Sequence, residues 1–163
     1  MNLKENYIDY TKNMLIEAGE KNIRLEILKQ ELPTLIKDLE KFKGIDYSNE
    51  SIGYGNKRGI DDLLIKREEK IEKIKEEIKD LEKFMNRLYI YIDKLDNDYR
   101  EVLIDRYINI KRFGKLTTFE KISDKMNLAE TTVKRYNRKA ICQLTRLING
   151  DKAIQSDTKI DIK

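Results

Sequence analysis

Apolar residues recur at alternating spacings of three and four along two long stretches of this 163-residue chain. In the stretch from Ile60 to Leu95, ten of eleven such positions are apolar, and the exception, Arg67, is expected to extend its charged end into solvent. The residues between these positions alternate in charge, which is typical of the solvent-facing side of a coiled coil. A second stripe of this period runs from Met14 to Phe42. The pattern predicts two long helices whose apolar faces each need a helical partner.

The connections within this helical region are less regular. Pro33 lies inside the first stripe and predicts a kink or a helix restart. Residues 44–60 contain four glycines and predict a Gly-rich break, which is either a connector or a binding loop that carries Tyr47, Tyr54, Lys57 and Arg58. The two helices then pair with each other as an antiparallel hairpin, or each pairs with the same helix of another subunit.

A different pattern begins after Leu95. Residues 96–98 offer short side-chain acceptors that predict a helix start, and the apolar positions that follow predict a helix ending at residues 113–114. Thr117 and Glu120 have the spacing of a capping box and predict a short helix.

The last elements are a turn, a long helix and a tail. Asn127 tolerates the left-handed conformation that a tight turn needs. The last helix is expected from about Ala129 to Ile148, because Asn149-Gly150 stops a helix. Residues 151–163 are polar and without helical period, so we expect them to be disordered.

A short helix, a tight turn and a longer basic helix together indicate a helix-turn-helix. We therefore predict an all-α fold, with long N-terminal helices over residues 1–95 and a helix-turn-helix domain over residues 96–150. The apolar residues expected to pack this domain are Phe119, Ile122, Met126, Leu128, Val133, Ala140, Ile141 and Leu144.

The charge distribution separates these two regions. The chain has a net charge of +4, but residues 99–150 carry 12 basic and 5 acidic residues, so the remaining residues sum to −3. The last helix has no acidic residue from Thr131 to Asn149, and Arg135, Arg138 and Arg146 share one of its faces. A cationic helix face of this kind meets the electrostatic requirement for binding DNA phosphates.

The composition argues against several kinds of site. The chain contains no His, which excludes imidazole metal ligands and general bases, and the single Cys142 cannot form an internal disulfide or a zinc site. Adjacent carboxylates such as Asp61 and Asp62 diverge on a helix and make a poor ligand set. We expect no enzyme activity, no cofactor and no metal. The apolar runs fall far short of the roughly 20 residues that span a bilayer, so we expect a cytoplasmic protein without a membrane partner.

The stretch from Leu95 to Leu144 resembles region 4 of the sigma-70 family. The matching motifs are L-x-x-x-x-R-x-V-L-x-x-R-Y, T-F-E-K-I-S and T-V-K-R-x-x-x-K-A-I. The family often has Ser or Thr where this chain has Ala129, so we expect a weaker cap on the recognition helix, or one supplied from elsewhere. In that family the start of the recognition helix reads a promoter element. The resemblance implies that bases are contacted by Glu130, Thr131, Thr132, Lys134 and Arg135, and phosphates by Thr118, Arg138, Lys139 and Arg146.

No part of the upstream chain looks like the promoter-melting region of a sigma factor. The layout is similar instead to that of phage late-gene transcription activators of the ArpU/RinA type. This resemblance implies a regulator that binds double-stranded DNA in the bacterial cytoplasm and switches on late genes. We expect a homo-oligomer, with a dimer favoured because paired operator half-sites suit dimers. The alternatives are a DNA-packaging protein such as a small terminase subunit, and a coiled-coil adaptor that docks on RNA polymerase.

Overall fold

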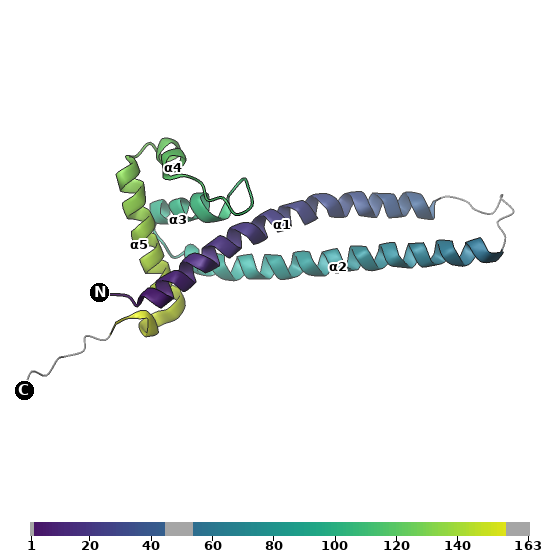
Figure 1. Cartoon of the computed structure of the whole chain (residues 1–163), viewed down its shortest axis with the longest axis horizontal. Helices are drawn as coiled ribbons and strands as arrows, with labels where there is room; N and C mark the ends of the chain where they lie inside the picture. Colours follow the sequence, from purple (N-terminus) through teal and green to yellow (C-terminus); the bar gives the residue numbers. More distant parts are fainter. Residues whose placement is uncertain (1, 45–53, 156–163) are drawn as a thin grey trace, which may run out of the picture. The chain divides into compact units, whose positions relative to one another are not determined.

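The computed structural model describes residues 2–44 and 54–155, with side chains from residue 59 onward in the second range. Outside two isolated β-bridges, these residues form helices joined by turns, which confirms the predicted all-α fold. The α-helices, labelled in Figure 1, are α1 (Glu5–Lys43), α2 (Tyr54–Ile92), α3 (Asn97–Leu103), α4 (Phe119–Met126) and α5 (Glu130–Asn149). The π-helix η2 (Ile104–Ile108) follows α3, and the 3-10 helix η3 (Gly150–Ala153) follows α5.

Helix α1 runs without a break through Pro33, so the expected restart does not occur. The hydrogen bond that proline removes is offset by packing on both sides, because Leu28 is buried and Leu35 is half-buried.

The Gly-rich break is shorter than predicted, because α2 begins at Tyr54 rather than after residue 60. A Cβ added at Gly59 would meet nothing within 4 Å, so this glycine sits in an open helix position that costs about 1 kcal/mol relative to alanine. The predicted loop residue Tyr47 and the side chains of Tyr54, Lys57 and Arg58 lie outside the described residues.

The chain divides into two compact units. We call residues 24–83 the hairpin unit, and residues 1–23 together with 84–163 the helix-turn-helix unit. These units do not divide at residue 95, where the sequence placed the boundary, since the start of α1 and the end of α2 group with the helix-turn-helix.

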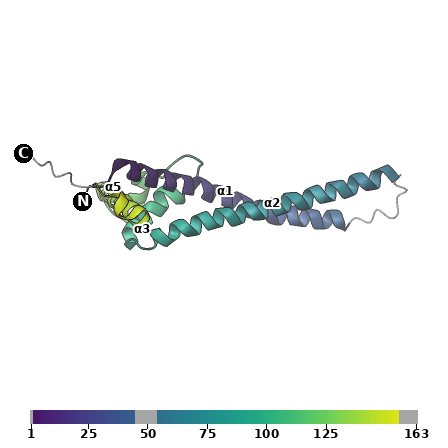
Figure 2. The same cartoon turned by 90° about the horizontal axis from the view of Figure 1, so that it is seen from below.

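In the hairpin unit, α1 and α2 pack side by side and antiparallel (Figures 1 and 2). The apolar stripes meet within the chain and bury Leu25 and Leu28 of α1 and Ile71 and Ile74 of α2. Of the two pairings that the sequence left open, the antiparallel hairpin is therefore the one that this unit adopts.

Ion pairs between oppositely charged side chains also join the two helices of the hairpin unit. Exposed pairs of this kind contribute about 0.2–1 kcal/mol each, so the apolar contacts supply most of the stability. The pairs among the described residues are Arg24–Glu77 (2.7 Å), Lys29–Glu82 (2.7 Å), Lys70–Glu31 (3.6 Å) and Lys43–Glu68 (2.6 Å).

Arg67, the one polar position of the second stripe, has its guanidinium carbon 4.7 Å from the centre of the Phe42 ring. It is exposed, as expected, and covers an aromatic ring at the same time.

The core of the helix-turn-helix unit draws on the start of α1 and the end of α2 as well as on the C-terminal helices. The cluster is formed by Leu15, Ala18, Met85, Leu88, Ile92, Leu95, Leu103, Tyr107, Ile108, Ala140, Ile141 and Leu144. Without residues 1–23 and 84–95, the C-terminal helices would lose a large part of this core.

Two contacts fix the start of α1 in this unit. A Cβ at Gly19 would overlap the carbonyl oxygen of Tyr107, so only glycine fits where α1 passes η2. The hydroxyl of Thr145 donates to the hydroxyl of Thr11 over 2.9 Å, and both side chains are fully buried.

Residues 150–153 form η3 and Ile154 makes a β-bridge to Leu3, so the disorder expected for residues 151–155 is not found. Ala153 is buried, and its carbonyl accepts a hydrogen bond from the Lys4 N–H over 2.8 Å. Backbone bridging to residues 2–4 orders this segment, which a search for helical period could not detect. Residues 156–163 lie outside the described residues.

Candidate nucleic-acid interface

Helix α4 begins one residue later than the capping-box pattern predicts. Thr118 is its N-cap, and the Thr118 hydroxyl accepts a hydrogen bond from the Lys121 N–H over 3.4 Å. Thr117, the expected cap, instead uses its backbone, since its N–H donates to the Arg106 carbonyl over 3.1 Å.

The turn between α4 and α5 follows the prediction. Asn127 adopts the left-handed conformation, with φ 55° and ψ 44°. Ala129 occupies the N-cap of α5 and has no side-chain acceptor to offer, as expected. Helix α5 ends at Asn149, and its C-cap is Gly150, which has a φ of 59°.

The apolar residues predicted to pack the helix-turn-helix do so. Val102, Ile122 and Val133 form a buried cluster that Phe119, Met126, Leu128 and Tyr136 flank. Ala140, Ile141 and Leu144 of α5 face the larger core. The polar side of α5 is left exposed, which is where the candidate DNA-contacting residues lie.

The predicted base-reading residues lie at the start of α5. Glu130, Thr131, Lys134 and Arg135 are exposed, and Thr132 is half-buried. Lys134 forms an ion pair of 2.6 Å with Glu130, and its ammonium lies 5.8 Å from the centre of the Phe119 ring. The Arg135 guanidinium carbon lies 5.8 Å from the Tyr136 ring centre.

Of the predicted phosphate contacts, Arg138, Lys139 and Arg146 are exposed and make no ion pair within the described part of the chain. Arg146 lies eight residues beyond Arg138, about 12 Å along the helix, so these cations do not form one cluster. Thr118 is exposed, but its hydroxyl already accepts the capping hydrogen bond of α4.

Acidic residues of α1 approach this face of α5, which the sequence did not indicate. Glu5 and Asp9 line a pocket of about 510 Å³ together with Lys134, Arg138 and Cys142. Cys142 is half-buried there, so it does not share the exposure of the neighbouring arginines.

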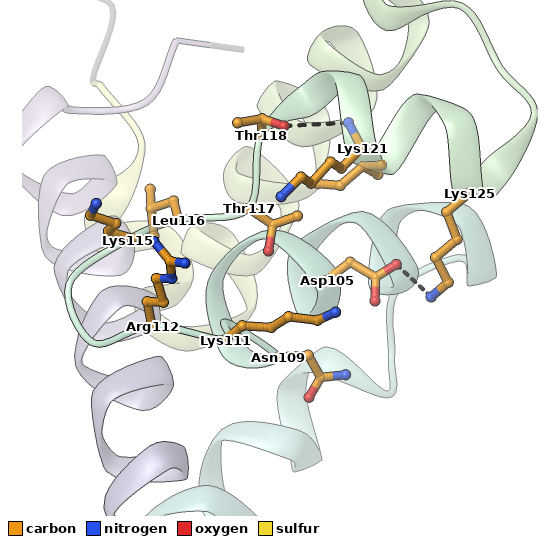
Figure 3. A pocket seen from close by; sticks show the side chains of 11 residues that line it. Asp105, Asn109, Lys111, Arg112, Lys115, Leu116, Thr117, Thr118, Lys121 and Lys125 are labelled. Atoms are coloured by element: carbon orange, nitrogen blue, oxygen red, sulfur yellow. Dashed lines mark hydrogen bonds and ion pairs between the residues drawn. The ribbon is translucent and has the colours of Figure 1, made fainter.

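Helix α3 continues directly into η2, which ends at Ile108, five residues before the predicted helix end. Residues 109–118 therefore form a connecting segment between η2 and α4. This segment, η2 and α4 enclose a cleft of about 650 Å³, which Figure 3 shows. We call it the basic cleft, and it is lined by Lys111, Arg112, Lys115, Lys121 and Lys125 together with Asp105, Asn109, Leu116, Thr117, Thr118 and Ile122. The sequence signal was the K-R-F-G-K run, which the predicted helix end obscured.

Arg106 holds the connecting segment against α4. Its guanidinium donates to the Thr117 carbonyl over 2.8 Å and lies 3.7 Å from the centre of the Phe119 ring. Arg106 is therefore a structural cation, and it positions one wall of the basic cleft.

Lys125 is the one cation of the basic cleft that is paired with a carboxylate within the described residues. Its ammonium lies 2.7 Å from Asp105 and 3.4 Å from Glu101. The hydrogen bond to Asp105 is the main cause that raises the pKa of Lys125, so this side chain stays charged and paired.

Residues 2–44 and 54–155 contain no group of three or more Cys, Asp or Glu side chains that could hold a metal ion. In the same residues, no helix is both long and apolar enough to cross a membrane. Searches of protein-family models, curated proteins and solved structures found no match for this chain.

Proposed function

We propose that this protein is a sequence-specific DNA-binding transcription regulator that uses α4, the Asn127 turn and α5 as a helix-turn-helix. One observation carries the proposal: these helices bury their apolar residues inward and leave the cationic side of α5 exposed. From Thr131 to Asn149, α5 carries five basic residues and no acidic one. A helix about 10–12 Å across fits the major groove, which is about 12 Å wide.

Arg135 is the residue best suited to read a base. It is exposed near the start of α5 and has no carboxylate partner within the described residues. An arginine in this place can donate two hydrogen bonds to the major-groove edge of a guanine. To contact DNA, Lys134 has to break its ion pair with Glu130. The free-energy cost is small, because exposed ion pairs contribute only about 0.2–1 kcal/mol.

The role in late-gene activation rests on the resemblance of residues 95–144 to sigma region 4 and on the helical extension before it. In this role, the protein would bind promoter DNA as its target and RNA polymerase as a second partner.

DNA binding is tested by measuring affinity for the protein's own promoter region at several salt concentrations. We expect the logarithm of the association constant to fall steeply and linearly with the logarithm of salt concentration. Arg135→Ala should reduce discrimination between sites by about 1–3 kcal/mol, whereas Arg87→Ala, an exposed arginine on α2, should not. Affinity that does not change between low and moderate salt would overturn the proposal.

The oligomeric state stays a prediction. In the hairpin unit the apolar stripes are buried by pairing within one chain, so their burial needs no second subunit. Mass measurement in solution separates the alternatives, because a dimer suits paired half-sites and a ring of many subunits favours a packaging protein.

A further inference from the structure

We propose that the basic cleft is a second DNA-contact site that binds phosphates of the duplex backbone beside the groove that α5 enters. This inference rests on the proposed DNA-binding function and adds residues that neither the helix-turn-helix pattern nor the sigma resemblance assigned: Lys111, Arg112, Lys115 and Lys121.

The first argument is charge. Five cations and one carboxylate line the basic cleft, and Lys125 is neutralised by its pairs with Asp105 and Glu101. The other four cations are exposed and have no ion-pair partner within the described residues. Like charges gathered around one cleft repel one another until an anion lies between them, so the arrangement favours a ligand with several negative charges.

The second argument is the neutral groups beside these cations. Asn109, Thr117 and Thr118 also line the basic cleft, and their side chains can donate hydrogen bonds. Phosphate oxygens are bound by this combination of charge and hydrogen-bond donors. Thr118 also caps α4, so the positive end of that helix dipole lies at the edge of the basic cleft.

The third argument is that the wall carrying the cations is already ordered. The Asn109 N–H donates to the Ile104 carbonyl over 2.8 Å at one end, and Arg106 holds Thr117 at the other. Between them the Lys115 N–H donates to the Arg112 carbonyl over 3.1 Å, closing a turn in which Gly114 has a φ of +69°. A preorganised wall loses less conformational freedom when a ligand binds.

The fourth argument is position. Arg106, beside the basic cleft, and Lys134 of α5 both lie over the Phe119 ring, at 3.7 and 5.8 Å from its centre. Thr118, the residue before Phe119, lines the basic cleft. The start of α4 therefore adjoins both sites, and in a helix-turn-helix complex the first helix crosses the DNA backbone.

The test compares the wild-type chain with a cleft variant, Lys111→Gln/Arg112→Gln/Lys115→Gln, over a range of salt concentrations. We expect affinity for specific and nonspecific DNA to fall by a similar factor, about ten- to a hundredfold, and the salt slope to decrease by about 2–3. Preference between sites should be unchanged, because phosphate contacts carry no sequence information. All three side chains are exposed, and equal melting temperatures would show that the variant folds.

The matched control is Lys66→Gln/Lys73→Gln/Lys79→Gln, which makes the same change in net charge at exposed positions of the hairpin unit. The single variant Lys121→Gln removes a cleft cation from α4 without altering the connecting segment. A cleft variant whose salt slope equals that of the control would overturn the inference while leaving the proposed function in place. A wild-type chain that binds no DNA would overturn both.

Inorganic pyrophosphate distinguishes a small phosphate ligand from the DNA backbone. If the cleft variant loses stabilisation by pyrophosphate but keeps the wild-type salt slope for DNA, the cleft is a site for small phosphates and the inference is wrong. If both effects are lost together, the backbone assignment is supported.

Discussion

The hairpin unit carries 14 basic and 15 acidic residues, whereas the helix-turn-helix unit carries 20 basic and 15 acidic ones. In the hairpin unit, opposite charges pair between α1 and α2, as in Arg24–Glu77 and Lys43–Glu68. In the helix-turn-helix unit, cations such as Lys111 and Arg112 form no ion pair within the described residues. The charges of the hairpin unit thus serve helix pairing, whereas the excess of basic residues in the helix-turn-helix unit leaves cations available to an anionic ligand.

Packing differs as well. In the hairpin unit, apolar residues repeat along both helices and most of them pack in equivalent surroundings. The helix-turn-helix unit depends instead on single close contacts, such as that of Gly19 with Tyr107. Substitutions of one residue type should therefore have very different effects in the two units.

The largest effect is expected from Gly19→Ala. The added methyl group would overlap the Tyr107 carbonyl, and the backbone would have to move, so the free energy of unfolding should fall by about 3 kcal/mol or more. Urea unfolding followed by circular dichroism measures this loss. Gly59→Ala is the matched control in α2, where open space surrounds the position, and it should raise stability by about 0.5–1 kcal/mol. Equal effects of the two substitutions would contradict the contrast between the units.

The next effect concerns Arg106, a cation of the helix-turn-helix unit that contacts a carbonyl and aromatic rings. Arg106→Met removes the charge-assisted hydrogen bond to Thr117 and should lower the free energy of unfolding by about 2 kcal/mol. Because it loosens one wall of the basic cleft, it should also weaken DNA binding. Arg87→Met, at an exposed arginine of α2, is the control and should leave both measurements nearly unchanged.

A smaller effect tests where α4 begins. Thr118→Ala removes the N-cap acceptor and should lower the free energy of unfolding by about 1 kcal/mol. Thr117→Ala should have much less effect, because the hydrogen bonds that link Thr117 to Arg106 use the Thr117 backbone. Thermal unfolding of both variants measures the difference. A larger loss of stability for Thr117→Ala than for Thr118→Ala would instead support Thr117 as the cap, as the capping-box pattern predicted.

The sequence predicted features that local chemistry determines and missed those that depend on distant partners. The stripe containing Ile71 and Ile74 and the left-handed Asn127 follow from spacing and residue type, and both are found. The order of residues 151–155 depends on the backbone of residues 2–4, which no local pattern reveals. The early helix end at Ile108 also depends on a distant partner. Arg106 and Thr117 form hydrogen bonds with each other, and these turn the chain toward α4.

The candidate site follows the same division. The exposed cations of α5 could be predicted because helical period alone places them opposite Val133 and Ala140. The basic cleft could not, since it exists only where η2, the connecting segment and α4 meet.

The smallest effect concerns the pH dependence of the hairpin unit. The hydrogen bond from Arg24 is the main cause that lowers the pKa of Glu77. Because the pKa is lower in the folded chain, the pair adds stability above the ordinary glutamate pKa of about 4.3, and this stability is lost as pH falls through the lowered value. Glu77→Gln should therefore slightly flatten the acid limb of the stability curve and leave its shape near neutral pH unchanged. Chemical unfolding of both proteins between about pH 2 and pH 7 measures this.

The control is Glu76→Gln, at a neighbouring carboxylate that has no ion pair in the described residues. This substitution should not flatten the acid limb in this way. An equal change in both variants would show that the Arg24–Glu77 pair has no special role in the pH dependence.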